Sequence, residues 1–558
     1  MTMTDTPPAT DTASAAPSPA ATGLYDALTT TDHKAIGRMW MKSGALLLIG
    51  AVVLGVLVGF ERLDADTVDI FGGDNAFMQM WALYRIGLAL LVAMPLFIGL
   101  ATVVVPMQVG STNIAFPRAA LAAVWGFVLG AGIMLASVFA GGGWGALDRA
   151  TGDERDAIAL TLAGMGMVII SLLLASVCIA TTVVSLRVKG MTLMRTPLFA
   201  WSMLVATAVW LLTLPVLLAN LLIAYVDLHN GPGAFGGGLN GDTSIWAQVA
   251  WLVEQPQVYA FAIPALGILG SVAPVAAGVK ASRHGLSMAM IGLFGLVSFG
   301  AWSQPYFQFD LAADVQYDQK FIFIVFGIAA VIPVLVFIGG IGGALLRGRN
   351  NISGLPAAHL LGALGGVLIV ALGVVAGVAR VIEPLELGAV VTQTGVMGTI
   401  AISGVMNLVL IGAIASAIGG FWFWASKIGG HELPPMMGRM VALSLLGGAL
   451  LLGGGQVANG FLDTPNSPLG VVTEDAADAL NIVSLIGMIL VGLGALGLVA
   501  ALAKAMRSGE PGSDNPWNGQ TLEWSTVGGS FTEAPARVTS ETPLLDASDA
   551  PSDEGEES

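Results

Sequence analysis

Side chains that could bind a metal or carry a redox reaction are scarce in this sequence. It has five histidines and one cysteine among its 558 residues. Imidazole ligates transition metals well while it stays neutral in apolar surroundings, but no histidine lies in the middle of an apolar segment. The histidines are His33, His229, His284, His359 and His431. Cys178 stands alone and can form neither an intrachain disulfide nor a paired-cysteine metal site. The sequence therefore predicts no metal site built from several histidines or cysteines inside the apolar segments.

A few other polar residues interrupt the apolar segments. Tyr259 follows Gln255 by four residues, a spacing that places both on one helix face. Arg85 and Glu254 lie near the ends of apolar segments. A charge inside a membrane is a candidate functional group, and a buried Arg85–Glu254 ion pair would satisfy both. The alternative is that each side chain extends to the membrane surface.

These residues must be positioned by membrane-spanning helices. The chain is 55% hydrophobic and only 11% charged, whereas soluble domains carry about 25% charged residues. Its apolar residues fall in runs of about twenty, the length that crosses a bilayer as a helix. We predict an all-α polytopic membrane protein, a bundle of twelve transmembrane helices. They centre on residues 43–60, 87–106, 119–140, 158–185, 200–225, 247–278, 285–309, 321–346, 355–379, 388–423, 440–460 and 480–504.

Charged residues alternate in sign from loop to loop. Arg187, Lys189 and Arg195 follow the fourth segment, whereas Asp227 and Asp242 follow the fifth. By the positive-inside rule both termini face the cytoplasm. Three regions are expected: a disordered N-terminal tail (1–24), the transmembrane domain (25–507) and a cytoplasmic C-terminal tail (508–558). The net charge of −15 gives no support to nucleic-acid binding, which needs a basic surface.

Several motifs, in order along the chain, resemble those of subunit I of the heme–copper oxidases, the family of cytochrome c oxidase. They are "TTTDHKAIGRMW" (29–40), "MPLFIGLATVVVPMQVGSTNIAFPRAA" (94–120), "GMTLMRTPLFAWSMLV" (190–205), "QPQVYAFAIPALGI" (255–268), "GGFWFWASKIGG" (419–430), "DNPWNGQTLEWS" (514–525) and "FTEAP" (531–535). The residues of these segments are most similar to those of family members from high-G+C Gram-positive bacteria. The resemblance implies that the protein lies in the lipid bilayer of a bacterial plasma membrane. It also implies a complex with subunits similar to II and III.

The same resemblance implies two hemes and one copper, held by six histidines. Carried across position by position, those ligand positions fall on other residue types here: Tyr84, Gln255, Gln304, Pro305, Gly404 and Met406. Three positions of the family's proton paths fall on Asn113, Gln257 and Phe337, which cannot carry a proton as Asp, Glu or Lys can. Tyr259 matches a tyrosine that the family retains. We therefore expect no heme, copper or other metal, and no catalytic residue in this chain.

Three functions remain open on these residues. The first is a redox-inactive scaffold or accessory subunit of an aerobic respiratory complex. The second is a working terminal oxidase that passes electrons from cytochrome c to oxygen with non-standard ligands. The third is a transporter or channel that uses the emptied cofactor cavity, lined by Gln255, Gln257, Gln304 and Tyr259.

Overall fold

The computed structural model describes residues 23–63, 69–144, 152–230, 245–280, 283–303, 325–352, 354–382, 399–466, 475–508, 511–531, 537–538 and 540–548. In these residues the chain forms helices and isolated β-bridges, which confirms the all-α prediction. The principal helices are α1 (Leu24–Thr29), α2 (His33–Glu61), α3 (Asp74–Ile86), α4 (Met94–Val109), α5 (Pro117–Phe139), α6 (Gly152–Ser185), α7 (Leu198–Asn230), α8 (Ile245–Val249), α9 (Ile263–Ala277), α10 (His284–Ser298), α12 (Val331–Arg347), α13 (Ala358–Ile382), α14 (Ala401–Phe423), α15 (Ala425–Gly429), α16 (Pro435–Ala449), α17 (Gly455–Gly460), α18 (Asp475–Ser508) and α19 (Pro543–Ser548).

Short 3₁₀ or π turns connect or extend several of these helices. The π turns are η1 (Gly87–Ala93), between α3 and α4, and η10 (Leu450–Gly454), between α16 and α17. The 3₁₀ turns are η2 (Leu193–Arg195), η3 (Ala250–Val253), η4 (Gln257–Phe261), η5 (Ala301–Ser303), η7 (Arg349–Asn351) and η11 (Leu522–Ser525).

Eleven helices in the described residues are long and apolar enough to cross a membrane. The sixth predicted segment, 247–278, differs from the others because its one long regular helix is Ile263–Ala277. Its first half consists of α8, η3 and η4, a break that coincides with Pro256 and Pro264. Proline lacks the N–H that a continuous helix needs. The bundle of twelve segments is therefore confirmed, with one segment only half helical.

Two elements form the centre of the bundle. The helical run from α3 through η1 to α4 is wholly buried along its most apolar part, and α14 is nearly so. Small residues let α14 approach its neighbours closely: a Cβ added to Gly412 would lie 2.8 Å from the carbonyl oxygen of Gly366 on α13. Such close backbone approach is typical of membrane helices. The centre positions the candidate site described below.

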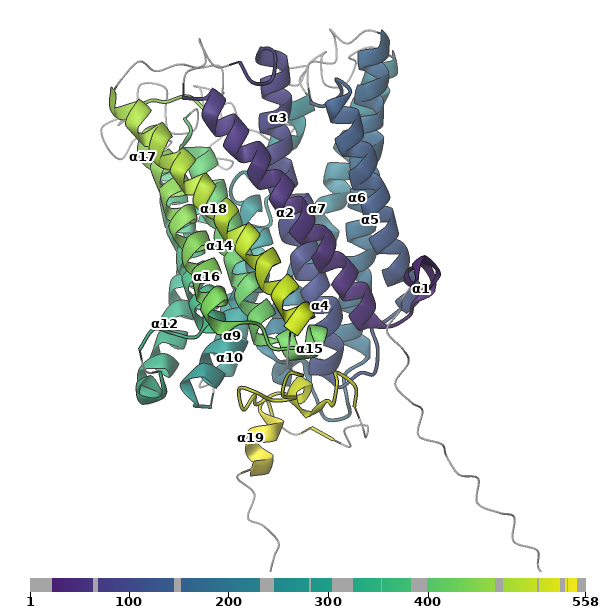
Figure 1. The fold of residues 1–558 in the computed structure, drawn as a ribbon, viewed down its shortest axis with the longest axis vertical. Helices are drawn as coiled ribbons and strands as arrows, with labels where there is room; N and C mark the ends of the chain where they lie inside the picture. Colours follow the sequence, from purple (N-terminus) through teal and green to yellow (C-terminus); the bar gives the residue numbers. More distant parts are fainter. Residues whose placement is uncertain are drawn as a thin grey trace, which may run out of the picture.

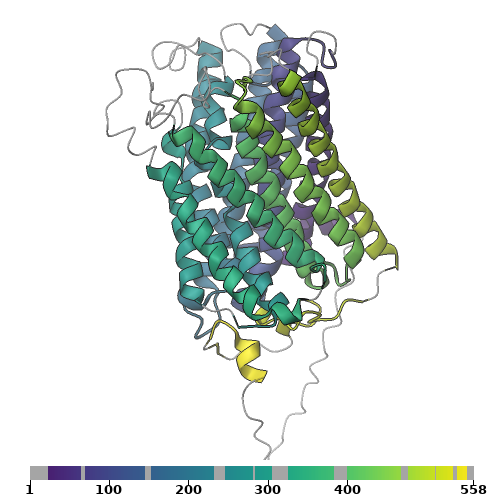
Figure 2. The ribbon, with the colours of Figure 1, turned by 90° about the vertical axis from the view of Figure 1, so that its left-hand side faces the viewer.

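The long helices run roughly parallel to one another (Figures 1 and 2). The first described helix, α1, and the last, α19, lie at the same end (Figure 1). Residues 511–531 fold against that end: Trp517 donates to the carbonyl of Phe423 at 3.0 Å, and Gly512 donates to that of Gly430 at 2.9 Å. The end of the chain beyond α18 is thus partly built into the bundle.

Candidate functional site: a buried polar centre

Gln255 and Tyr259 lie at the break between η3 and α9, deep in the bundle. Gln255 is 5% exposed and Tyr259 is fully buried. Tyr259 Oη donates to Gln255 Oε1 at 3.3 Å, and Gln255 Nε2 donates to the carbonyl oxygen of Gly377 at 2.7 Å. A Cβ on Gly377 would lie 2.3 Å from the tyrosine oxygen. Only glycine lets α13 come this close, so the two side chains are enclosed by its backbone.

Gln257 joins the same segment to two other elements. Its Oε1 accepts a hydrogen bond from the backbone N–H of Gly300 at 2.9 Å and from Thr213 Oγ1 at 3.3 Å. A Cβ on Gly300 would stand 2.7 Å from the backbone nitrogen of Gln257. Gln257 therefore holds the segment after α10 against α7, a structural task that its buried amide oxygen can perform.

A second polar group lies between α3, α14 and α17. Tyr84 Oη donates to Asn407 Oδ1 at 2.7 Å, and Asn407 Nδ2 donates to Gln456 Oε1 at 2.8 Å. The sequence reasoning missed Asn407 and Gln456. The signal available for Asn407 was an amide inside an otherwise apolar segment next to Met406.

Arg85 is buried beside this group, with 1% of its surface exposed. Its Nη1 donates to Ser403 Oγ at 2.9 Å and to Asn466 Oδ1 at 3.2 Å. The guanidinium also lies 4.6 Å from the ring centre of Trp81, a distance at which a cation is attracted to the aromatic face. Arg85 is thus enclosed by the bundle instead of reaching its surface. The ion pair with Glu254 stays a prediction.

Met406 and Gly404 lie on α14 between the two groups. Met406 is 1% exposed and lines two cavities, one shared with Gln255 and the other with Tyr84 and Arg85. The larger cavity has a volume of about 50 Å³, which is room for a few water molecules. A Cβ on Gly404 would lie 2.6 Å from the carbonyl oxygen of Gly453. Helices therefore meet backbone to backbone at Gly404.

The remaining predicted positions are dispersed. Phe337 is buried in α12, and Asn113 lies after α4, where its Nδ2 donates to the carbonyl of Thr31 at 3.0 Å. Glu254 is half-buried at the end of η3, and its carbonyl accepts from the backbone N–H of Val258 at 2.9 Å. Gln304 and Pro305 fall outside the described residues.

The histidines lie away from this centre. His33 and His284 are the first residues of α2 and α10, and His359 is the second residue of α13. His33 Nδ1 lies 3.0 Å from the carbonyl oxygen of Thr102, and the His359 ring centre lies 4.3 Å from that of Trp517. His229 stands in the last turn of α7 and His431 bridges to Pro511.

The donors at the predicted ligand positions do not fit a centre of two hemes and one copper. Gln255 and Tyr84 use their polar atoms in hydrogen bonds to other buried groups. Gly404 has no side chain, and its surroundings leave no space for an imidazole in this arrangement. Within the described part of the chain, no group of three or more His, Cys, Asp and Glu side chains gathers as a metal site would need. No reaction step through heme or copper follows from these residues.

Known proteins match this chain along most of its length. Residues 35–490 match the family model described as cytochrome c and quinol oxidase polypeptide I. A "Putative cytochrome c oxidase subunit 1-beta" of Streptomyces avermitilis is 30% identical, over 96% of this chain and 95% of that protein. The "Cytochrome c oxidase subunit 1" of Bacillus subtilis is 27% identical, over 90% of this chain and 79% of its own.

The fold has also been seen in a solved structure. A chain of a heme-copper terminal oxidase dimer, determined by electron cryomicroscopy, superposes with a TM-score of 0.66. The alignment covers 93% of this chain and 89% of that chain, at 14% sequence identity. This likeness supports the fold alone.

These matches correct one prediction. The expectation that the chain carries no heme or copper is wrong, because the matched family is that of the heme–copper oxidases, whose members carry hemes and copper. The expectation rested on residue types at assigned positions.

The family model spans well over half of the chain, and the Streptomyces relative aligns over nearly all of it. One helical bundle contains the ordered segments, the irregular half-segment that precedes α9, and the close backbone contacts of α14. The chain is therefore a multi-pass membrane protein that belongs to the family of cytochrome c and quinol oxidase polypeptide I.

Proposed function

We propose that this chain is a structural, redox-inactive subunit of the subunit I type in an aerobic respiratory complex. The supporting observation is the engagement of its central polar side chains with one another. Gln255 binds both Tyr259 and the backbone of Gly377, and Tyr84 binds Asn407. Buried hydrogen bonds of this kind hold helices together. The polar centre then acts as internal cross-linking of the scaffold.

The place of the scaffold follows from its family and its charges. Subunits of type I work in membrane complexes with other oxidase subunits, and the proposed partners are subunits similar to II and III. The charge alternation supports a bacterial plasma-membrane protein with both termini in the cytoplasm, and the position of α1 and α19 at one end of the bundle is consistent with an even number of spans (Figure 1). Residues 1–24 and 508–558 form the proposed cytoplasmic tails.

A second function is favoured by the 30% identity to a protein named as a putative cytochrome c oxidase subunit. In this function the chain is a working terminal oxidase with unusual ligands. Tyr84 and Met406 line one cavity, and both residue types ligate heme iron in other proteins. Their present contacts would have to change for either to serve as a ligand.

One experiment separates the two functions. The complex is affinity-purified from its own bacterium with a tag on this chain, and its subunits, heme absorbance and oxygen uptake are measured. The structural role predicts that Met406→Leu and Tyr84→Phe change neither absorbance nor uptake. A working oxidase with these ligands predicts that at least one substitution removes both. Leu212→Ala, on the exposed surface of α7, is the control for the effects of substitution itself.

A further inference from the structure

Glu523 is an acid inserted into the bundle from the end of the chain. It lies in η11 with none of its surface exposed. Its Oε1 accepts hydrogen bonds from Gln108 Nε2 at 3.0 Å and from Trp424 Nε1 at 3.3 Å. Gln108 is itself fixed, because its Oε1 accepts from the backbone N–H of Ala200 at 3.1 Å. One carboxyl thereby connects α4, α7 and the end of α14 to a segment that follows α18.

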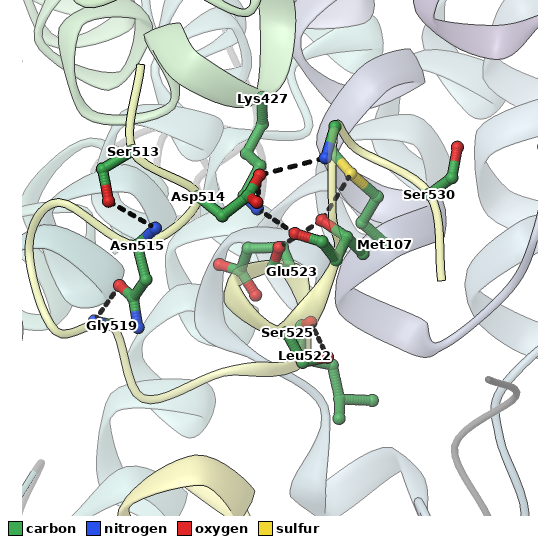
Figure 3. A network of polar contacts seen from close by, with 12 residues as sticks. Met107, Lys427, Ser513, Asp514, Asn515, Gly519, Leu522, Glu523, Ser525 and Ser530 are labelled. Atoms are coloured by element: carbon green, nitrogen blue, oxygen red, sulfur yellow. Dashed lines mark hydrogen bonds and ion pairs between the residues drawn. The ribbon is translucent and has the colours of Figure 1, made fainter. Parts of the chain in front are cut away.

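The segment from 511 to 531, here called the latch segment, is held by further contacts around Glu523 (Figure 3). The side chain of Lys427 in α15 is fully buried. Its Nζ donates to the carbonyl oxygen of Thr526 at 2.5 Å and lies 3.6 Å from Oδ1 of Asp514. Thr526 Oγ1 in turn lies 3.8 Å from the sulfur of Met107. The Glu523 carboxyl is therefore the central contact of a segment held at several points.

Other charged groups face this region from α2. Lys34 donates to the carbonyl of Gly528 and to Ser530, each at 3.2 Å, and Arg38 donates to the carbonyl of Ile428 at 3.1 Å. The charged groups around the Glu523 carboxyl are thus Lys427 and the half-exposed Asp514, with Lys34 and Arg38 farther along the same surface. The groups that contact its Oε1, Gln108 and Trp424, are neutral.

This environment favours the uncharged form of the carboxyl. Burial raises the pKa of Glu523 and outweighs the hydrogen bonds from Gln108 and Trp424, which favour the charged form. Within the described residues, Oε2 has no hydrogen-bond partner. A buried carboxylate needs its several acceptor sites filled, and a bare charged oxygen in an apolar site is costly. Loss of the proton therefore favours any arrangement in which Glu523 reaches water.

We propose that Glu523 is a proton-binding site that fastens the latch segment to the bundle. With its proton bound, the carboxyl occupies its buried position between Gln108 and Trp424. When the proton leaves, the carboxylate moves out to water and the latch segment detaches. The segment then uncovers the end of the bundle formed by α4 and α15, so that the chain couples the proton activity on this side to the exposure of that surface.

The direction of the pH effect follows from the raised pKa. A group that binds its proton more tightly when the latch is closed stabilises the closed state at low pH, and this contribution is lost as pH rises through the pKa of the closed state. Burial lowers the pKa of Lys427, and the nearby carboxylate of Asp514 opposes this effect. The lysine therefore favours closure as pH rises, opposite to the effect of Glu523. A substitution at Glu523 alone separates the two contributions.

Hydrogen–deuterium exchange of the purified full-length protein in detergent tests the proposal. Protection of residues 511–531, corrected for the intrinsic exchange rate, is measured from mildly acidic to mildly alkaline pH. Release of a single proton predicts that protection falls by up to about tenfold per pH unit between the pKa of Glu523 in the open state and its higher pKa in the closed state, and levels off above the latter. In Glu523→Gln, whose amide oxygen accepts the same hydrogen bonds but cannot titrate, protection should no longer fall as pH rises, and the opposite dependence that comes from Lys427 should remain.

Asp546→Asn is the matched control, because Asp546 pairs with Lys280 at 2.9 Å on the exposed surface of the same chain end. It should keep the wild-type pH profile. A flat profile in the wild type, or a wild-type profile in Glu523→Gln, would overturn the proposal.

If Glu523→Gln does not fold, infrared spectra of wild-type protein with labelled glutamate give a second reading. They should show a protonated carboxyl band that disappears over the pH range in which protection is lost. Absence of that band at every pH also contradicts the proposal.

Discussion

The Tyr259 hydroxyl donates its hydrogen bond to Oε1 of Gln255, a glutamine that at the same time donates to the backbone of Gly377. One amide thus satisfies a buried hydroxyl and a buried carbonyl on two different segments. Helix α13 covers this arrangement so tightly that a single added carbon at Gly377 would overlap the tyrosine oxygen. Its chemistry as it stands is that of a structural hydrogen-bond bridge.

The two members of this bridge should differ in their contribution to stability. Gln255→Ala removes two buried hydrogen bonds, one to Tyr259 Oη and one to the carbonyl of Gly377, each worth about 0.5–1.5 kcal/mol. Tyr259→Phe removes one hydrogen bond of 3.3 Å, worth about 0.6 kcal/mol on average between membrane helices. Unfolding in mixed micelles measures both free energies. Equal losses in the two variants would contradict the bridging role of Gln255.

The contact at Gly404 should tolerate no side chain. Gly404→Ala places a Cβ 2.6 Å from the carbonyl oxygen of Gly453 and 2.7 Å from the nitrogen of Val457, both backbone atoms. Overpacking of this kind costs about 1–3 kcal/mol. Gly454→Ala is the control, since its Cβ meets nothing within 4 Å, and helix propensity favours alanine there by up to about 1 kcal/mol. Thermal unfolding of the two variants should shift in opposite directions.

Tyr84 and Asn407 should be energetically coupled. Their side chains share a buried hydrogen bond of 2.7 Å between residues 323 positions apart. A double-mutant cycle with Tyr84→Phe and Asn407→Ala should give a coupling energy of about 0.5–2 kcal/mol, because each single change removes the same bond. Strict additivity would show that the bond contributes nothing to folding.

The exposed ion pair near the end of the chain should matter little. Lys280 Nζ and Asp546 Oδ1 lie 2.9 Å apart, and both side chains are half-exposed. The hydroxyl of Ser540 lowers the pKa of Asp546 most, and the Lys280 ammonium lowers it further. Solvent screens such pairs, and salt weakens them further. Asp546→Asn should leave the unfolding temperature within the error of the measurement. A clear loss at low ionic strength that vanishes at high salt would show a larger electrostatic role.

The sequence predicted the bundle well because each membrane-spanning helix is determined by the apolar residues of its own segment. A run of about twenty apolar residues is readable without knowing its neighbours. The exception, residues 247–278, carries its own signal in Pro256 and Pro264, but the extent of the break depends on how α10 and α13 pack against it. Gly300 and Gly377 allow that close packing, and the pattern of apolar residues in the sequence distinguishes neither of them from other glycines.

The polar centre was predictable residue by residue but not as a set of contacts. Tyr84 and Gln255 stood out by type, whereas their partners Asn407 and Gly377 come from segments more than a hundred positions away. Which helix faces meet is decided by packing, and a single sequence does not record it. Glu523 illustrates the same limit: its motif was visible, but its burial between Gln108 and Trp424 was not.

The central claim is that the polar centre supports the fold of a respiratory subunit and performs no redox step. The most direct measurement is the oxygen uptake of the affinity-purified complex carrying Tyr259→Phe, compared with the wild-type complex at equal subunit content. The account predicts the same rate per complex in both. A loss of uptake in a complex whose subunits and thermal stability are unchanged would contradict it.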